Sequence, residues 1–434
     1  DVGWSLVRGR AALEYRAVVF GERGAGDAQV GGDRLAGLRA LAADEPVETV
    51  VRGRVGTGGD RVVWVFPGQG AQWVGMGVEL LDASAVFAGR IAECAAALAP
   101  FVDWSLVDVL RGASDAPGAA GIAGVGGVVG AGGAGLLERV DVVQPVSWAV
   151  ALGLAAVWES WGVCPDVVVG HSQGEIVAAC VAGLLSLEDG ARVVAARSRV
   201  IAGELAGCGG MASVALPVGG VEVRLREWAG RSGVGAGRVE VAAVNGPSAT
   251  VVAGEPAGLD ELLSVWEAEG VRVRRLPVDY ASHTVQVDRV RDRLIAELAG
   301  IVPRVGTVEM WSTVTGSPVV SGQLDGEYWF RNLRSTVRLH EVADALVGEG
   351  HRVFVEISPH PVLTAAIIET AEAAGVPDAV VVGSLRRGDG GLDRLAAGAA
   401  QLWVRGVPVD WAPLVAGGRQ VDLPTYPFQN QRYW

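Results

Sequence analysis

A serine between two glycines, at the junction of a strand and a helix, constrains the fold of this chain more than any other feature. Residues 166–169 include three consecutive valines, and Gly170-His-Ser-Gln-Gly174 follows them directly. Residues 175–184 then have the pattern of a helix. Glycines permit the sharp turn that lifts such a serine to the carboxyl edge of a sheet. The sequence therefore predicts an α/β fold with Ser172 at that edge.

Ser172 is the candidate nucleophile, and it needs an activating base. The N–H of Gln173, at the start of the helix, would point to where an oxyanion forms. The chain has five histidines. His171 adjoins the serine, but neighbouring side chains at such a turn point apart, so we interpret it as a packed support. His340 and His351 are predicted on an exposed helix and in its following turn.

Two histidines remain as candidate bases. His360 lies in the loop after a predicted strand at 353–357, and His283 ends the run Tyr280-Ala-Ser-His283. His283 is favoured because an inserted segment returns the chain to the main domain just before it, and such a junction lines a cleft. The residues alone leave both candidates open.

Strand and helix patterns divide the chain into several parts. Residues 1–58 are predicted as a small α/β domain with strands at 15–20 and 49–55 and a helix at 33–43. Another strand, at 61–66, precedes Pro67-Gly-Gln-Gly70. Residues 112–135 are mostly Gly, Ala and Val, and we interpret them as a surface insertion, because a phosphate-binding loop needs a strand before it and a helix after it.

Residues 210–277 show the order β-α-β-β-α-β, which favours an inserted ferredoxin-like subdomain. We therefore predict a large α/β-hydrolase-like subdomain, residues 59–209 and 278–386, interrupted by that insertion. The last part, 387–434, ends in Leu423-Pro-Thr-Tyr-Pro-Phe-Gln-Asn-Gln-Arg-Tyr-Trp434. Its prolines and aromatic residues are typical of an extended segment laid across a surface.

Composition excludes several classes of function. The net charge of −13 argues against nucleic acid or an acidic membrane surface as partner. The chain has no lysine, so a Schiff-base mechanism is excluded and an anion site must use arginine, histidine or backbone N–H groups. The four cysteines have no metal-ligand spacing, so we expect no metal site, no disulfides and a cytoplasmic location. The apolar runs are shorter than a bilayer span, and the chain begins with Asp1, which suggests a piece of a longer protein.

Three motifs together resemble a known family. Phe66-Pro-Gly-Gln-Gly-Ala-Gln72, Gly-His-Ser172-Gln-Gly and Tyr-Ala-Ser-His283 have the order and spacing of malonyl-CoA:acyl-carrier-protein acyltransferases. The whole chain is similar to the acyltransferase domain of a modular type I polyketide synthase. In that resemblance, 1–58 is the linker from the ketosynthase, 59–386 the acyltransferase domain, and 387–434 the linker that returns to the ketosynthase.

The resemblance implies roles for individual residues. Ser172 matches the acylated nucleophile and His283 its base, and the backbone N–H groups of Gln69 and Gln173 match the oxyanion hole. Three further positions match residues that hold the acyl carboxylate, line the acyl pocket and orient the histidine through a main-chain carbonyl, and these are Arg197, Gln144 and Asn332. No bound cofactor is implied: acyl-CoA is the substrate and the phosphopantetheine of an acyl carrier protein is the acceptor.

The motif before the histidine indicates the acyl group. Within the family, Tyr-Ala-Ser-His accompanies methylmalonyl units and His-Ala-Phe-His malonyl units. Ser282 leaves volume for a methyl branch that a phenyl ring would fill, so Tyr280 and Ser282 are expected to contact the substrate. The (2S) form is implied by the resemblance alone. Ethylmalonyl or malonyl transfer, a serine thioesterase or esterase, and an inactive scaffold are the alternatives.

Overall fold

The computed structural model describes residues 1–21, 27–56, 61–112, 135–232 and 238–425, which form two compact units. The smaller unit comprises the described residues within 1–57, 158–163 and 399–434, and the larger one those within 58–157 and 164–398. The expected glycine-rich insertion, apart from its two end residues, and residues 426–434 of the tail lie outside the described residues.

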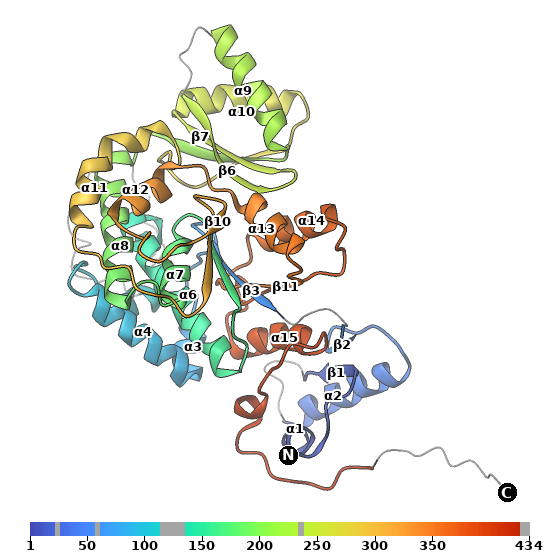
Figure 1. Ribbon diagram of the computed structural model, residues 1–434. Coiled ribbons are helices and arrows are strands. Elements are labelled where there is room, and N and C mark those ends of the chain that lie inside the picture. Colours follow the sequence, from blue (N-terminus) through green and yellow to red (C-terminus); the bar gives the residue numbers. More distant parts are fainter. Residues whose placement is uncertain (22–26, 57–60, 113–134, 233–237, 426–434) are drawn as a thin grey trace, which may run out of the picture. The chain divides into compact units, whose positions relative to one another are not determined.

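The larger unit is built on a six-stranded sheet with the order β10-β9-β4-β3-β11-β12 (Figure 1). All neighbours are parallel except the edge strand β10, which is antiparallel to β9. The bounds are β3 Val62–Phe66, β4 Val167–Gly170, β9 Glu309–Ser312, β10 Ser317–Pro318, β11 Val353–Glu356 and β12 Val380–Gly383. The central strands β3 and β4 are buried along their whole length, which explains their unbroken apolar sequence.

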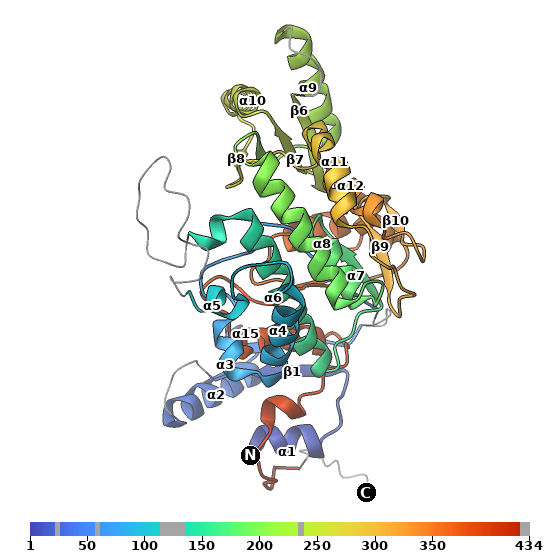
Figure 2. The same cartoon turned by 90° about the vertical axis from the view of Figure 1, so that its left-hand side faces the viewer.

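Helices cover both faces of this sheet. Helices α13 (Leu339–Gly348) and α14 (Thr364–Ala373) pack on the valines of β3 and β4 in one hydrophobic core, whereas α7 (Gly174–Val181) lies on the other side of the sheet in Figure 1. Helices α7 and α8 (Leu187–Val200) lie side by side (Figure 2). Outside the inserted residues 210–277, the other described helices between residues 78 and 403 are α3 Val78–Ala83, α4 Ala85–Leu98, α5 Leu106–Leu110, η1 Leu136–Glu138, α6 Val140–Ser160, η2 Ile201–Leu205, η3 Val285–Val290, α11 Arg291–Glu297, α12 Gly326–Arg334 and α15 Leu392–Trp403.

The predicted ferredoxin-like insertion is confirmed. Its four antiparallel strands have the order β6-β7-β5-β8, so the first and third strands of the β-α-β-β-α-β chain order lie in the centre and the second and fourth at the edges, as in a ferredoxin-like sheet. The elements are β5 Gly210–Val214, α9 Val218–Ser232, β6 Val239–Gly246, β7 Ala249–Gly254, α10 Pro256–Ala268 and β8 Val273–Arg275. A separate apolar core, including Trp228 and Trp266, lies between this sheet and its two helices.

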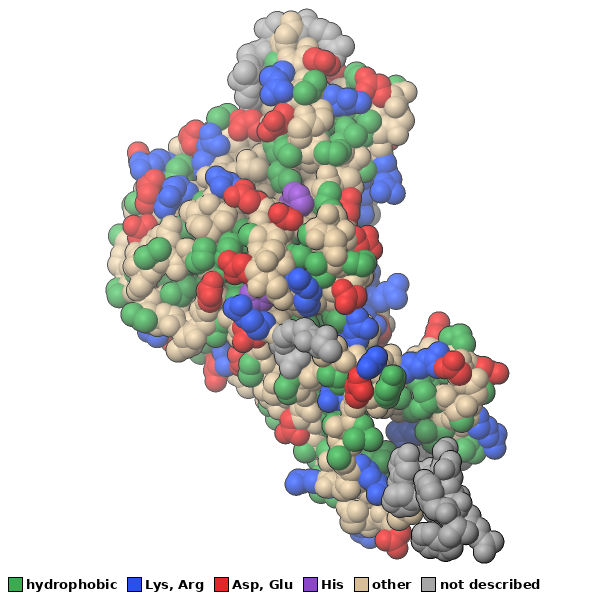
Figure 3. Space-filling view, turned by 45° about the vertical axis from the view of Figure 1, so that its right-hand side comes forward, with side chains coloured by type: hydrophobic (Ala, Val, Ile, Leu, Met, Phe, Trp, Pro, Cys, Tyr) green, Lys and Arg blue, Asp and Glu red, His purple; other side chains and the backbone are tan. Residues whose placement is uncertain are grey.

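The expectation that every apolar run is shorter than a bilayer span is wrong for helix α6, the one described helix that is long and apolar enough to cross a membrane. Its apolar window is 89% buried inside the fold, which is typical of the core helix of a globular domain. On the face shown in Figure 3, arginine and acidic side chains are interspersed. That face therefore offers no extended basic surface of the kind that follows a nucleic-acid backbone.

The smaller unit contains the two predicted strands, β1 (Tyr15–Val19) and β2 (Val50–Arg54), which pair antiparallel. Helix α2 (Asp27–Ala42) begins earlier than predicted, and α1 (Val2–Gly9) was not predicted. A short turn, η4 (Ala412–Val415), precedes a described stretch of tail with no helix or strand, 416–425. This stretch lies against the N-terminal segment, where Ser5 Oγ accepts a hydrogen bond from Val421 N and Arg10 donates to Pro424 O.

Candidate active site

The turn that carries Ser172 has the predicted form. Gly170 ends β4 and Gly174 begins α7. A Cβ atom on Gly170 would collide with the backbone of Glu175, and one on Gly174 with the carbonyl of Phe66. Ser172 itself has φ of 54°, a left-handed conformation that costs a non-glycine residue about 1–3 kcal/mol. The two glycines and the strained serine together fix the side chain at the carboxyl edge of the sheet.

His283 lies beside the serine. The Ser172 Oγ and His283 Nε2 atoms are 2.8 Å apart, and both residues are buried. His283 Nδ1 lies 2.8 Å from the carbonyl oxygen of Ser335, so Nδ1 carries the proton and Nε2 accepts from the serine hydroxyl. Like the serine, His283 has a positive φ, of 63°. This geometry is that of a nucleophile and its general base.

The pKa of His283 is lowered to about 3, chiefly because its burial disfavours the imidazolium. The neighbouring Arg197 and His171 lower it further. The imidazole is therefore neutral at physiological pH and free to accept a proton from Ser172.

Arg197 reaches the same serine from helix α8. Its side chain is buried, and Nη2 donates a hydrogen bond of 2.8 Å to Ser172 Oγ. Within the described chain the guanidinium contacts Asn332 and Ser172 and is in no ion pair, and its Nε has no hydrogen-bond partner. Burial lowers the pKa of Arg197 to about 10, which leaves it cationic at neutral pH. A buried cation with no acidic partner, at a nucleophile, can receive an anionic substrate group.

Asn332 does not orient the histidine as the resemblance implied. The carbonyl that accepts from His283 Nδ1 belongs to Ser335, three residues further along. Asn332 lies inside α12, whereas Ser335 is the first residue after the helix and has an extended backbone with ψ of 152°. A carbonyl in that conformation leaves the direction of the helix axis and can face the imidazole. The Asn332 side chain contacts Arg197, the carbonyl of Ser172 and Glu175 instead.

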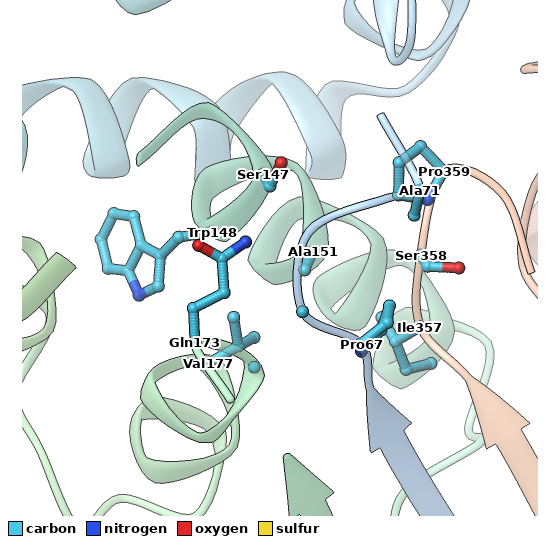
Figure 4. A pocket seen from close by; sticks show the side chains of 12 residues that line it. Pro67, Ala71, Ser147, Trp148, Ala151, Gln173, Val177, Ile357, Ser358 and Pro359 are labelled. Atoms are coloured by element: carbon cyan, nitrogen blue, oxygen red, sulfur yellow. The ribbon is translucent and has the colours of Figure 1, made fainter. Parts of the chain in front are cut away.

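The two expected oxyanion donors lie at the ends of neighbouring parallel strands. Gln69 follows β3, and Gln173 is the N-cap of α7. Among the described residues, neither backbone N–H donates to a protein acceptor. The Gln173 side chain points away toward Ser147 and Trp148 of α6, in a cavity of about 20 Å³ (Figure 4). That cavity has the size of one water molecule and is not the acyl pocket.

Two of the residues expected to contact the substrate, Tyr280 and Gln144, lie in one chain of hydrogen bonds with Gln69. Tyr280 donates to Gln69 Oε1 over 2.7 Å, and Gln144 Nε2 lies 3.5 Å from the tyrosine oxygen. Ser282 is buried too, and its hydroxyl faces Met211 Sδ of β5 at 3.5 Å. A larger side chain at position 282 would therefore displace Met211 or enter the space beside His283.

Three of the other histidines are hydrogen-bonded to groups other than Ser172. His171 Nε2 lies 2.8 Å from Asn245 Oδ1 of the ferredoxin-like subdomain, and burial lowers its pKa. His360 accepts a hydrogen bond from Arg387 N, and His340 faces Thr370 Oγ1. His351 was predicted in an exposed turn, but it is fully buried because it lies directly before β11 at the base of the sheet.

Glu175 is a site residue that the sequence interpretation did not identify. It lies in the first turn of α7, three residues after the serine, and is fully buried. Its carboxylate accepts from Thr313 N, Tyr328 Oη and Asn332 Nδ2 at 2.6–2.9 Å. The available signal was an acidic residue in a helix that follows a fully buried strand, since such a carboxylate requires several donors.

The α/β fold, with a serine and a histidine in contact at the carboxyl edge of its sheet, is that expected of an acyltransferase, and the comparisons with known proteins identify the family. Residues 63–409 match the family described as "Acyl transferase domain", to which the chain belongs. The chain is 51% identical over its whole length to the polyketide synthase GfsE of Streptomyces halstedii, and it spans 11% of that protein. The chain is thus similar to one segment of a much longer polypeptide.

Two solved structures extend the comparison. The acyltransferase domain of module 8 of the salinomycin polyketide synthase is 49% identical, with a TM-score of 0.83 over 95% of this chain and 89% of that one. The acyltransferase domain of SpnD, in complex with 2-(pent-4-yn-1-yl)malonyl, is 27% identical, with a TM-score of 0.70 over 86% and 83% of the two chains. The chain is therefore an acyltransferase domain of the modular polyketide synthase type.

Proposed function

We propose that this domain transfers an extender acyl group, (2S)-methylmalonyl, from coenzyme A to Ser172 and then to the phosphopantetheine thiol of an acyl carrier protein. The observation that carries the proposal is the buried, cationic Arg197 in contact with Ser172 Oγ. A guanidinium at that position selects acyl groups that carry a free carboxylate, because the carboxylate accepts hydrogen bonds from the unpaired N–H groups.

The first half-reaction uses the buried pair. Ser172 Oγ attacks the thioester carbon while His283 Nε2 takes the hydroxyl proton. The N–H groups of Gln69 and Gln173 stabilise the oxyanion, and loss of one such donor costs about 3 kcal/mol of barrier. The carbon–sulfur bond then breaks, and His283 gives the proton to the departing sulfur, so that CoA leaves as a thiol and the imidazole is neutral again.

The second half-reaction reverses these steps with another thiol. His283 accepts the proton of the carrier thiol, whose sulfur attacks the acyl-serine ester. The bond to Ser172 Oγ breaks and the serine regains its proton from His283. Because a thioester is consumed and another is formed, the transfer is close to thermoneutral.

A thioesterase or esterase would share the first half and use water in the second. An α/β-hydrolase triad would place an Asp or Glu on the histidine. In this chain the His283 Nδ1 faces the carbonyl of Ser335 instead. The Ser172–His283 pair has no carboxylate on the histidine, and Arg197 is placed to bind the carboxylate of an acyl group. Both features favour acyl transfer over hydrolysis.

The proposal for the acyl group depends on the Tyr280-Ala-Ser-His283 motif. Ser282 and Tyr280 are buried beside the dyad, and a phenylalanine at position 282 would overpack the contact with Met211 by about 1–3 kcal/mol. A larger branch is the main rival, because the related SpnD domain holds a 2-(pent-4-yn-1-yl)malonyl group.

A competition among malonyl-, methylmalonyl- and ethylmalonyl-CoA for the domain and a carrier protein tests this choice. We expect methylmalonyl to load preferentially over malonyl, by roughly ten-fold or more, because one methyl group contributes discrimination of that order. Preferential loading of malonyl would contradict the pocket argument. Preferential loading of ethylmalonyl would show that the space beside Ser282 admits a longer branch.

The partners follow from the same proposal. A carrier protein is expected to bind through a small transient interface, since it must leave to serve other domains. A ketosynthase of the same polypeptide is the expected neighbour of residues 1–58 and 387–434. A cytoplasmic location follows from the acyl-CoA donor.

Within the described chain no group of three or more His, Cys, Asp or Glu side chains could hold a metal.

A further inference from the structure

The guanidinium of Arg197 is held by an amide rather than by a carboxylate. Arg197 Nη1 donates to Asn332 Oδ1, while Asn332 Nδ2 donates to the carbonyl of Ser172 at 3.1 Å and to Glu175 Oε2 at 2.9 Å. Only this orientation of the Asn332 amide gives every group around it a suitable hydrogen-bond partner. The reverse orientation would place its NH₂ against the guanidinium and its oxygen against two acceptors.

Glu175 is what fixes this orientation. Its Oε1 accepts from Thr313 N, a backbone group that can only donate, and its Oε2 is an acceptor to which the Asn332 amide must present its NH₂. Hydroxyl groups of Thr313 and Tyr328 lie at 2.8 and 2.7 Å from the same two oxygens. The carboxylate is therefore locked on one side by the backbone and directs the Asn332 NH₂ on the other.

The spacing of the charges has a consequence for substrate binding. A carboxylate bonded directly to Arg197 would occupy the N–H groups that the acyl carboxylate needs. With Asn332 between them, Glu175 offsets the buried positive charge electrostatically while the guanidinium keeps unpaired N–H groups, including Nε. The hydrogen bond from Arg197 to Asn332 holds the guanidinium in place, and its remaining N–H groups are left for the substrate carboxylate.

We propose that Glu175 and the Asn332 side chain are positioning residues that hold Arg197 ready for the substrate carboxylate, and so set the preference for carboxylated acyl groups. This inference rests on the proposed carboxylate-binding role of Arg197. Neither residue needs to touch the reacting atoms, because each acts through the orientation of the guanidinium.

The test compares methylmalonyl-CoA with propionyl-CoA, which differ by the carboxylate alone. The readout is the ratio of kcat/KM values for acylation of Ser172, and the ratio of Kd values in a Ser172→Ala background. In Glu175→Gln, the new NH₂ must face a donor, either Thr313 N or Asn332 Nδ2. The backbone group cannot turn, so Asn332 is expected to turn and disturb Arg197. We expect the ratio to fall by about ten-fold, the usual effect of losing a hydrogen bond to a charged group.

A matched control is Glu356→Gln. Glu356 is another fully buried carboxylate, which accepts from the N–H groups of Val362, Leu363 and Thr364 and has no contact with Arg197. This variant should lose stability and keep the ratio. A merely structural role for Glu175 would give the same result as the control, and that outcome in a folded Glu175→Gln protein would overturn the inference.

Two further variants keep the outcomes distinct. Asn332→Asp bonds a carboxylate directly to Arg197, so it should lower the ratio at least as far, and it decides the question if Glu175→Gln does not fold. Retention of the ratio in folded Asn332→Asp would then overturn the inference. Arg197→Ala should remove the preference entirely. If Arg197→Ala keeps the preference, or if the unmodified domain shows none, the proposed role of Arg197 fails as well. If Arg197→Ala removes the preference but the Glu175 and Asn332 variants leave the ratio unchanged, only the positioning role fails.

Discussion

Replacing Ser172 by alanine should reduce covalent acylation by an acyl-CoA to less than about one thousandth of the unmodified rate, because no other group can form the acyl intermediate at the turn. Ser172 has a strained φ of 54°, and a Cβ atom on Gly170 or Gly174 would collide with neighbouring backbone, so the backbone of the turn is arranged around this side chain. The measurement is intact mass after incubation with the donor, without carrier protein, followed by peptide mapping.

Ser198→Ala is the matched control for this experiment. Ser198 is a fully buried serine on α8, next to Arg197, and its hydroxyl donates to Ala195 O within the helix. This variant should load the acyl group normally. An acyl mass that persists in Ser172→Ala, or maps to another peptide, would show that the nucleophile is elsewhere.

Replacing His283 by alanine should slow acylation by about 10²–10⁴-fold, which is the usual contribution of a general base. His340→Ala, which removes a histidine of α13 bonded to Thr370 of α14, should leave the rate unchanged. A loss of less than ten-fold in His283→Ala would contradict the assignment of the base.

The same histidine predicts an unusual pH profile. Because burial lowers the pKa of His283 to about 3, the neutral form that acts as base persists well below the usual histidine range. The value of kcat/KM for acylation reports the free enzyme. It should therefore be flat from about pH 8 to pH 5, and fall only at lower pH as the imidazole gains its proton. An acid limb with a midpoint near pH 6.5 would show that the imidazole is solvated in the free enzyme, in contradiction to its burial.

The sequence predicted those parts of the fold that depend on local patterns. The strand, turn and helix around Ser172 were predicted because glycines, valines and a helical pattern are adjacent in the chain. The ferredoxin-like insertion was predicted because its elements alternate in the required order, and the observed strand order confirms it. Helix α1 was not predicted, because its eight residues are too few for a clear periodic pattern.

The site depended more on tertiary contacts. The choice between His283 and His360 could not be made from residue patterns, since each lies in a loop that follows a strand, β8 or β11. The carbonyl of Ser335 replaced that of Asn332 because the end of α12, and not a residue type, decides which carbonyl turns toward the imidazole. Glu175 was missed because its partners Thr313, Tyr328 and Asn332 come from segments far along the chain.

Transfer of the acyl group from Ser172 to a carrier protein, rather than to water, is the central claim of this account. The most direct test isolates the acylated domain after reaction with methylmalonyl-CoA, mixes it with a carrier protein that bears phosphopantetheine, and follows both proteins by mass over time. We expect the acyl mass to leave the domain and appear on the carrier much faster than it is lost to water when the carrier is absent. Loss of the acyl group to water at the same rate with and without the carrier would contradict the account and identify a hydrolase.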